Sequence, residues 1–205
     1  MDWREAVEVL RAPLLYGGGR HYIHAMYHFD WDSFPWYLYA HSYQSAADFL
    51  VSNLDEVDKN AHYAIMFLYR HSLEIKLKEH IFKLDQYLDS DNPGNLKDHN
   101  LATLWGEYQS KRSTVVDLFG LSDEGEFDHD DPVIERLREL GMLDEKSTGL
   151  RYPLGRDRSS SMQQVLGEDV VAVVDLVRVG TMVEAMTTVL DATGDWLESY
   201  AEAAG

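Results

Sequence analysis

One stretch constrains the fold more than any other: residues 62–88, which read HYAIMFLYRHSLEIKLKEHIFKLDQYL. At about 100° per residue, one helical face is apolar except for Arg70, which has Glu74 one turn further on. The apolar members of this face are Tyr63, Met66, Leu77, Ile81, Leu84 and Leu88. A second apolar flank leaves one clearly polar strip, with Ser72, Lys76, Glu79 and Lys83. This pattern predicts a long helix that packs on more than one side.

The segments on either side of this central helix also predict helices. Residues 36–54 have helical spacing, and the polar run DEVDKN separates them from the central helix, which predicts an antiparallel helical hairpin. After the loop DSDNPGN, Asp98 or Asn100 is well placed to cap a third helix, LATLWGEYQSKR. Pro132 suits the first turn of a short helix that ends at Gly141.

The C-terminal part completes the expected fold. Residues 168–200 predict a long helix with an acidic start, although their valine run VVAVVDLVRV is prone to form a strand. The expected fold class is all-α: an antiparallel helical bundle in which this helix closes the hairpin of residues 36–54 and 60–88. Residues 1–35 are expected to be an N-terminal appendage and linker, and residues 36–205 the helical domain.

The charge of the chain limits its partners. It has 36 acidic and 18 basic residues and a formal net charge of −18, which repels phosphate backbones, so any RNA contact must be local. Such a surface allows a basic protein partner. The absence of cysteine excludes disulfides and a thiol nucleophile. No apolar run is long enough to span a membrane, and the N-terminus lacks a signal-peptide pattern, which favours a cytoplasmic location without membrane contact.

The polar residues of the central helix have a structural and a functional interpretation. Arg70, Glu74 and Lys78 are spaced for simple ion pairs along one helix. An unpaired charge on an apolar face is costly, so Arg70 must meet Glu74, another acid or a ligand phosphate. His71 lies at the edge of the same face, where it can be a packing residue or can titrate near neutral pH.

Two motifs outside the central helix add candidates. His99 precedes the third helix and must fold back against the central helix, where it is either a neighbour of the helix cap or a general base or acid facing Arg70 and Glu74. The motif LRYPLGRDR contains Arg151 and Tyr152, in the only basic patch of note. These residues either pair with the acidic surface or contact a phosphate or RNA.

A metal site is a weaker hypothesis. His21, His24 and His28 would share a face if their segment were helical, and three imidazoles could then hold zinc with a carboxylate or water. The segment fits strand alternation as well as helical spacing, and the standard zinc spacings are absent. The sequence therefore predicts no cofactor.

Three blocks of the sequence carry a family resemblance: YRHSLEIKLKEHI from Tyr69, HNLATLW from His99 and RYPLG from Arg151. In this order they resemble blocks of a bacterial group of HEPN-like proteins, over about residues 36–190. The resemblance implies an all-α antiparallel bundle, commonly a homodimer in which two polar sites meet. Many HEPN proteins are metal-independent endoribonucleases of toxin, CRISPR or phage-defence systems that use an arginine followed, after four to six residues, by a histidine. No histidine of this sequence has an arginine at that upstream spacing.

Two functions are therefore expected. The first is a HEPN-like RNA-processing or phage-defence effector of the toxin type, a possible metal-independent endoribonuclease. Its catalytic residues would be Arg70, His71, Glu74 and His99, and its phosphate-binding residues Lys78, Arg151 and Tyr152. The second is a non-catalytic binding or assembly module, in which a buried Arg70–Glu74 pair fixes the helix register.

Overall fold

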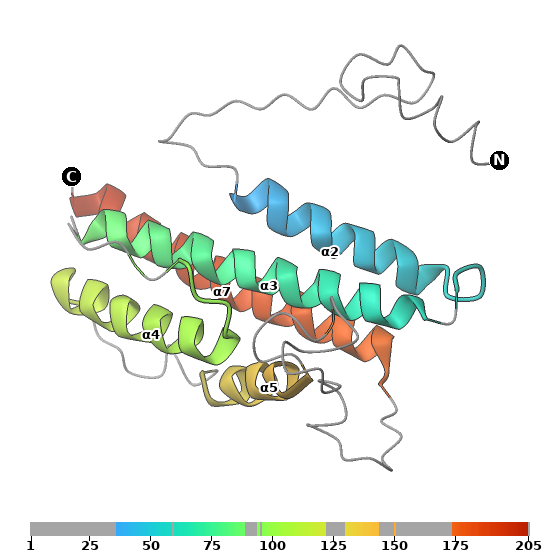
Figure 1. Cartoon of the computed structure of the whole chain (residues 1–205). Helices are drawn as coiled ribbons and strands as arrows, with labels where there is room; N and C mark the ends of the chain where they lie inside the picture. The colour runs from blue at the N-terminus through green and yellow to red at the C-terminus, as the bar shows by residue number, and fades with distance from the viewer. Residues whose placement is uncertain are drawn as a thin grey trace, which may run out of the picture. The chain divides into compact units, whose positions relative to one another are not determined.

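The computed structural model describes residues 36–58, 60–88, 94, 96–121, 130–143, 150 and 174–204. These residues form helices and contain no strand, so the predicted all-α class is confirmed for this part of the chain (Figure 1). The helices are α2 (Trp36–Ser52), α3 (Ala61–Tyr87), α4 (Leu101–Leu118), α5 (Asp130–Leu143) and α7 (Leu176–Ala204).

Helix α3 is the centre of the fold. It contacts α2, α4 and α7, and α5 packs on α4 (Figure 1). The main core lies between α3, α4, α5 and α7, and a smaller core joins α2, α3 and α7 around Ala47, Ile65, Tyr69 and Val183. The prediction that the central helix packs on more than one side is confirmed. Arg70 and Glu74 are buried with it.

Helices α2 and α3 run in opposite directions, as the predicted hairpin requires. The Trp36 ring near the start of α2 lies 6.5 Å from the Phe82 ring, whereas the Tyr43 ring lies 4.6 Å from the His71 ring, earlier in α3. Tyr69 Oη donates a hydrogen bond of 2.7 Å to Asp48 Oδ1 nearer the end of α2.

Helix α4 runs in the same direction as α3. His99, just before α4, contacts Glu74, and Lys111, further along α4, pairs with Asp85 at the end of α3. The chain must therefore return along α3 before α4 begins. Residues 89–100 can span about 40 Å when extended, and the return from Tyr87 to Arg70 is about 26 Å along a helix. At Gly94, an added Cβ would lie 2.5 Å from Ile81 Cγ2, so only glycine allows this close approach.

Helix α7 also follows the direction of α3. Its Gly180 faces the Tyr69 side chain, and its Gly194 faces His80, eleven residues further along α3. Within the described part, antiparallel pairing is therefore observed for α2 with α3 but not for α4 or α7 with α3. The hydrophobic pattern carries no information about which way a helix crosses its neighbour.

The helix boundaries depend on capping residues. Of the two candidates for the α4 cap, Asn100 is the residue used: its side chain accepts a hydrogen bond of 3.0 Å from Thr103 N. Helix α7 begins at Leu176, later than residue 168, and Asp175 Oδ1 caps its start by accepting a hydrogen bond of 3.0 Å from Arg178 N. Residues 168–173 lie outside the described residues.

Most of the strip predicted to be polar is buried. Ser72, Lys76 and Glu79 are almost completely inaccessible, and only Lys83 is exposed. Lys76 Nζ lies 2.9 Å from Glu79 Oε2 and 2.7 Å from Asp191 Oδ1 of α7, so these charges are paired where α2 and α7 cover α3. The expected appendage at residues 1–35 lies outside the described residues. Among the helices that are described, none is both long and apolar enough to cross a bilayer.

Candidate functional site

Arg70 and Glu74 form a buried ion pair on α3. Their side chains are 1% and 2% exposed, and Arg70 Nη1 donates a hydrogen bond of 3.0 Å to Glu74 Oε2. Arg70 Nη2 donates to the carbonyl oxygen of His99, in the connection before α4. Of the three partners expected for Arg70, namely Glu74, another acid or a ligand phosphate, the structure shows Glu74. Its guanidinium also ties α3 to the connection that returns along it.

Glu74 is the centre of the cluster. Its Oε1 accepts hydrogen bonds of 2.9 Å from Lys78 Nζ and of 2.8 Å from His99 Nδ1. Burial alone would raise the pKa of Glu74, but hydrogen bonds from Lys78 and His99, together with the charges of Lys78 and Arg70, lower it below its ordinary value. The carboxylate is therefore ionised at neutral pH and acts only as a hydrogen-bond acceptor.

His99 is the member of this cluster that solvent reaches. Its side chain is 52% exposed, although its partner Glu74 is buried. The backbone at this point is held because Asp98 Oδ1 accepts a hydrogen bond of 2.8 Å from Asn100 N, next to the α4 cap. Because Glu74 can only accept, the proton of a neutral His99 lies on Nδ1, and the lone pair lies on Nε2. No hydrogen bond from a described residue occupies Nε2.

His71 is close to the cluster but has different neighbours. Its Nδ1 lies 4.0 Å from Glu74 Oε2, beyond hydrogen-bond distance. Its ring stacks on Phe67 at 5.4 Å and meets the edge of Tyr43 at 4.6 Å. His71 is thus a partly buried member of an aromatic cluster between α2 and α3.

Several predicted residues lie outside the described residues. These are the phosphate-binding candidates Arg151 and Tyr152 and the metal candidates His21, His24 and His28. In the part of the chain that is described, no group of three or more histidine or acidic side chains is arranged to hold a metal ion. The structure brings together Arg70, Glu74, Lys78 and His99, with His71 beside them.

A second polar cluster, between α3 and α7, was not predicted from the sequence. Lys76, Glu79 and His80 of α3 meet Asp191 of α7, whose Oδ1 lies 3.2 Å from His80 Nε2. The helical spacing predicts contacts among the first three residues, but Asp191 is 111 positions from His80 and no local pattern indicates it. Only the packing of α7 on α3 reveals this pair.

The chain matches no protein-family model, no curated protein and no solved structure. The site is therefore interpreted from its own geometry. A buried carboxylate that holds one nitrogen of an exposed imidazole leaves the other nitrogen available to take up a proton, and it stabilises the imidazolium that forms. Proton transfer at His99 Nε2 is the chemistry this arrangement allows.

Proposed function

We propose that this chain is a HEPN-like, metal-independent endoribonuclease, an RNA-processing or phage-defence effector of the toxin type. One observation carries the proposal: His99, half exposed, places Nδ1 2.8 Å from the buried carboxylate of Glu74. The three sequence blocks that resemble HEPN-like proteins support the fold part of the proposal. The Arg70 block and the His99 block lie in contact at this cluster.

In the proposed reaction, His99 is the general base. Its Nε2 takes the proton from a ribose 2′-hydroxyl, and the 2′-oxygen attacks the adjacent phosphorus. The bond from phosphorus to the 5′-oxygen breaks, and this oxygen leaves with a proton from solvent. The products are a 2′,3′-cyclic phosphate and a free 5′-hydroxyl. The Glu74 carboxylate offsets the charge of the imidazolium, so the step needs no metal.

The other cluster residues are proposed as positioning residues. Arg70 and Lys78 are buried and hold Glu74 from either side, so neither reaches a phosphate without a rearrangement. This changes the role expected for Arg70 from stabilising charge on the phosphate to fixing the Glu74–His99 pair. We assign the direct phosphate contacts to Arg151 and Tyr152. Contacts at one basic segment agree with a net charge of −18, which permits only local RNA binding.

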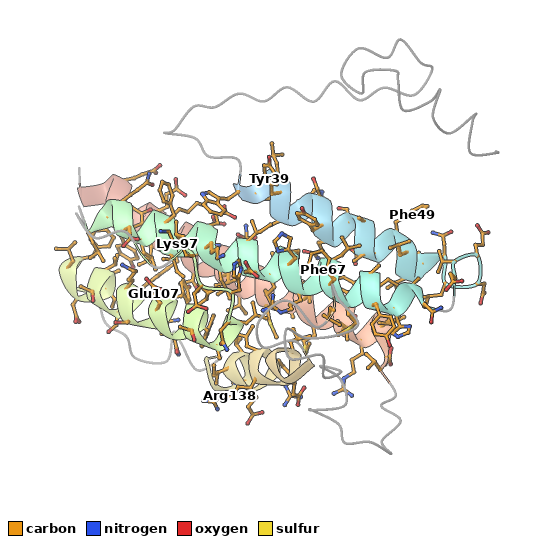
Figure 2. All side chains as sticks on the ribbon, in the orientation of Figure 1. Tyr39, Phe49, Phe67, Lys97, Glu107 and Arg138 are labelled. Carbon is orange, nitrogen blue, oxygen red and sulfur yellow. The ribbon has the colours of Figure 1, made fainter. Side chains whose placement is uncertain are left out.

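A homodimer is part of the proposal. The outer side of α2 offers one surface for it: Tyr39 and Phe49 point away from α3 there (Figure 2). Phe49 is 68% exposed, and Leu38 on the same side is 60% exposed. Large apolar side chains exposed together often mark contact surfaces, and the charge of the rest of the chain disfavours association elsewhere.

The experiment is RNA cleavage in EDTA. Purified wild-type protein should cleave a mixed RNA pool and leave 2′,3′-cyclic phosphate ends, and it should not cleave the same sequences carrying 2′-O-methyl ribose, which have no 2′-hydroxyl to attack. His99→Ala protein, purified in parallel, controls for a contaminating nuclease. Absence of cleavage by the wild type, or equal cleavage of the 2′-O-methyl pool, would contradict the proposal.

A non-catalytic assembly module is the second candidate. The near-complete burial of Arg70 and Glu74 favours it, because a buried ion pair can fix the register of neighbouring helices. If the wild type does not cleave RNA and Arg70→Ala is misfolded or monomeric, this second function accounts for the cluster and the search turns to protein partners.

A further inference from the structure

Helix α2 turns small side chains inward and large apolar ones outward. Its two buried residues are Ala40 and Ala47. On its outer side, Leu38 is 60% exposed, Phe49 68% and Tyr39 47%. Tyr39 and Phe49 point away from α3, against which α2 packs (Figure 2). Burial of large apolar side chains is the main favourable term in association, so the outer side of α2 has the composition of a contact surface.

The serines in the middle of this outer side are already hydrogen-bonded within α2. Ser42 Oγ donates a hydrogen bond of 2.6 Å to the carbonyl oxygen of Leu38. Ser45 Oγ lies 3.3 Å from His41 Nε2. A hydroxyl that is buried without a partner destabilises a contact. Because both hydroxyls have partners in their own helix, another apolar surface can cover them without leaving a polar group unsatisfied.

The charge of the chain favours a second copy as the partner at this side. Helix α2 has no lysine or arginine, and its one carboxylate, Asp48, accepts a hydrogen bond of 2.7 Å from Tyr69 Oη of α3. A strongly charged partner would find almost no opposite charge to pair with on α2. Two copies with a net charge of −18 repel each other over most of their surface, so an uncharged apolar side is where they can meet.

The spacing of the outer residues is complementary to itself. Leu38, Ser42, Ser45 and Phe49 lie along one stripe of the helix. A two-fold axis midway between Ser42 and Ser45 places this stripe on its own copy in the opposite direction. Leu38 then meets the partner's Phe49, and Ser42 meets the partner's Ser45. Small residues at the crossing point let the two helices approach closely.

We propose that α2 of one copy packs antiparallel on α2 of a second copy, with Leu38 against the partner's Phe49. This packing rests on the homodimer of the proposed function and fixes its helix, direction and register. Leu38 and Phe49 are about 16 Å apart along the helix, so the two apolar contacts close the interface on either side of the serines.

The crossing point lies near the Glu74 cluster. Tyr43 follows Ser42 in the sequence, and its ring lies 4.6 Å from the His71 ring of α3. His71 Nδ1 in turn lies 4.0 Å from Glu74 Oε2. The dimer therefore carries one Glu74 cluster on each side of its axis, at the same level along the paired helices.

Cysteine cross-linking tests this packing in the full chain, which has no cysteine of its own. In Ser42→Cys, the two new thiols face each other across the axis, about 4–5 Å apart along the helices, which is within reach of a disulfide. Mild oxidation should convert most of this variant to a disulfide-linked dimer on a non-reducing gel. Ser110→Cys, a matched change at an exposed serine of α4, should stay largely uncrosslinked.

Further variants test the direction and the register. Leu38→Cys or Phe49→Cys oxidised alone should give little linked dimer, because each thiol lies about 16 Å along the helix from its copy. An equal mixture of the two, left to exchange subunits before oxidation, should give several times more. Phe49→Arg, with circular dichroism like that of the wild type, should raise the dissociation constant of the dimer about 30-fold or more in analytical ultracentrifugation.

Cross-linking does not depend on RNA cleavage, so the dimer and the proposed reaction can fail separately. A wild type that is monomeric in analytical ultracentrifugation would overturn this packing. So would Ser42→Cys that links no more than Ser110→Cys, or Leu38→Cys that links as well alone as in the mixture. Cross-linking as expected in a chain that does not cleave RNA would support the dimer and contradict only the ribonuclease.

Discussion

Replacing Glu74 with alanine should lower the free energy of unfolding by about 3–5 kcal/mol. The substitution leaves the charges of Arg70 and Lys78 buried without the carboxylate that both contact, and it removes the anchor of the His99 side chain. Urea denaturation followed by circular dichroism in EDTA measures this change. Glu184→Ala, at an exposed glutamate of α7, should change stability by less than about 0.5 kcal/mol. A loss below about 1 kcal/mol for Glu74→Ala would mean that the cluster is far more hydrated than its burial indicates.

The stability supplied by the Glu74 charge should depend on pH in a defined direction. Because the folded state lowers the pKa of Glu74 below its ordinary value of 4.5, its charged form stabilises the fold fully above that value. This stabilisation is lost as the pH falls through the lowered pKa. The difference in stability between wild type and Glu74→Gln should therefore shrink in acid, below about pH 4.5.

Replacing His99 with alanine should slow RNA cleavage in EDTA by about 10²–10⁴-fold, the usual contribution of a general base. The fold should be little affected, because the side chain is half exposed and Glu74 keeps Arg70 and Lys78. Initial rates on one RNA oligonucleotide measure the effect. His62→Ala, at an exposed histidine in the first turn of α3, is the matched control and should cleave at the wild-type rate. Equal rates for His99→Ala and wild type would exclude His99 as the base.

Local sequence signals predicted the hairpin and much of the Glu74 cluster. Helical spacing identified α2 and α3, but it did not identify which sides are covered, because Leu38 and Phe49 of α2 are exposed and Lys76 of α3 is buried. The Arg70–Glu74 contact was predicted because a charge on the apolar face of a helix needs a partner. The approach of His99 to α3 was predicted because α4 has to bury its apolar face, whose Leu101 and Trp105 are in the core.

Features that depend on distant parts of the chain were not predictable in this way. The direction of α4 and α7 along α3 goes with close packing on α3 at Gly94, Gly180 and Gly194, and such contacts leave no periodic signal in the sequence. The burial of Lys76 was also not predictable, because its partner Asp191 lies in α7, far away in the sequence. The start of α7 was placed too early because apolar content and an acidic start did not distinguish the Asp175 cap from the acids before it.

Whether Glu74 acts through His99 is tested most directly by a double-mutant cycle of cleavage rates. Initial rates in EDTA are measured for wild type, Glu74→Gln, His99→Ala and the double variant, at a temperature where circular dichroism shows each to be folded. If the carboxylate works only by orienting and charging the imidazole, the double variant should cleave no more slowly than His99→Ala alone. Rate losses that multiply in the double variant, or a wild type that does not cleave RNA, would contradict a Glu74–His99 catalytic pair.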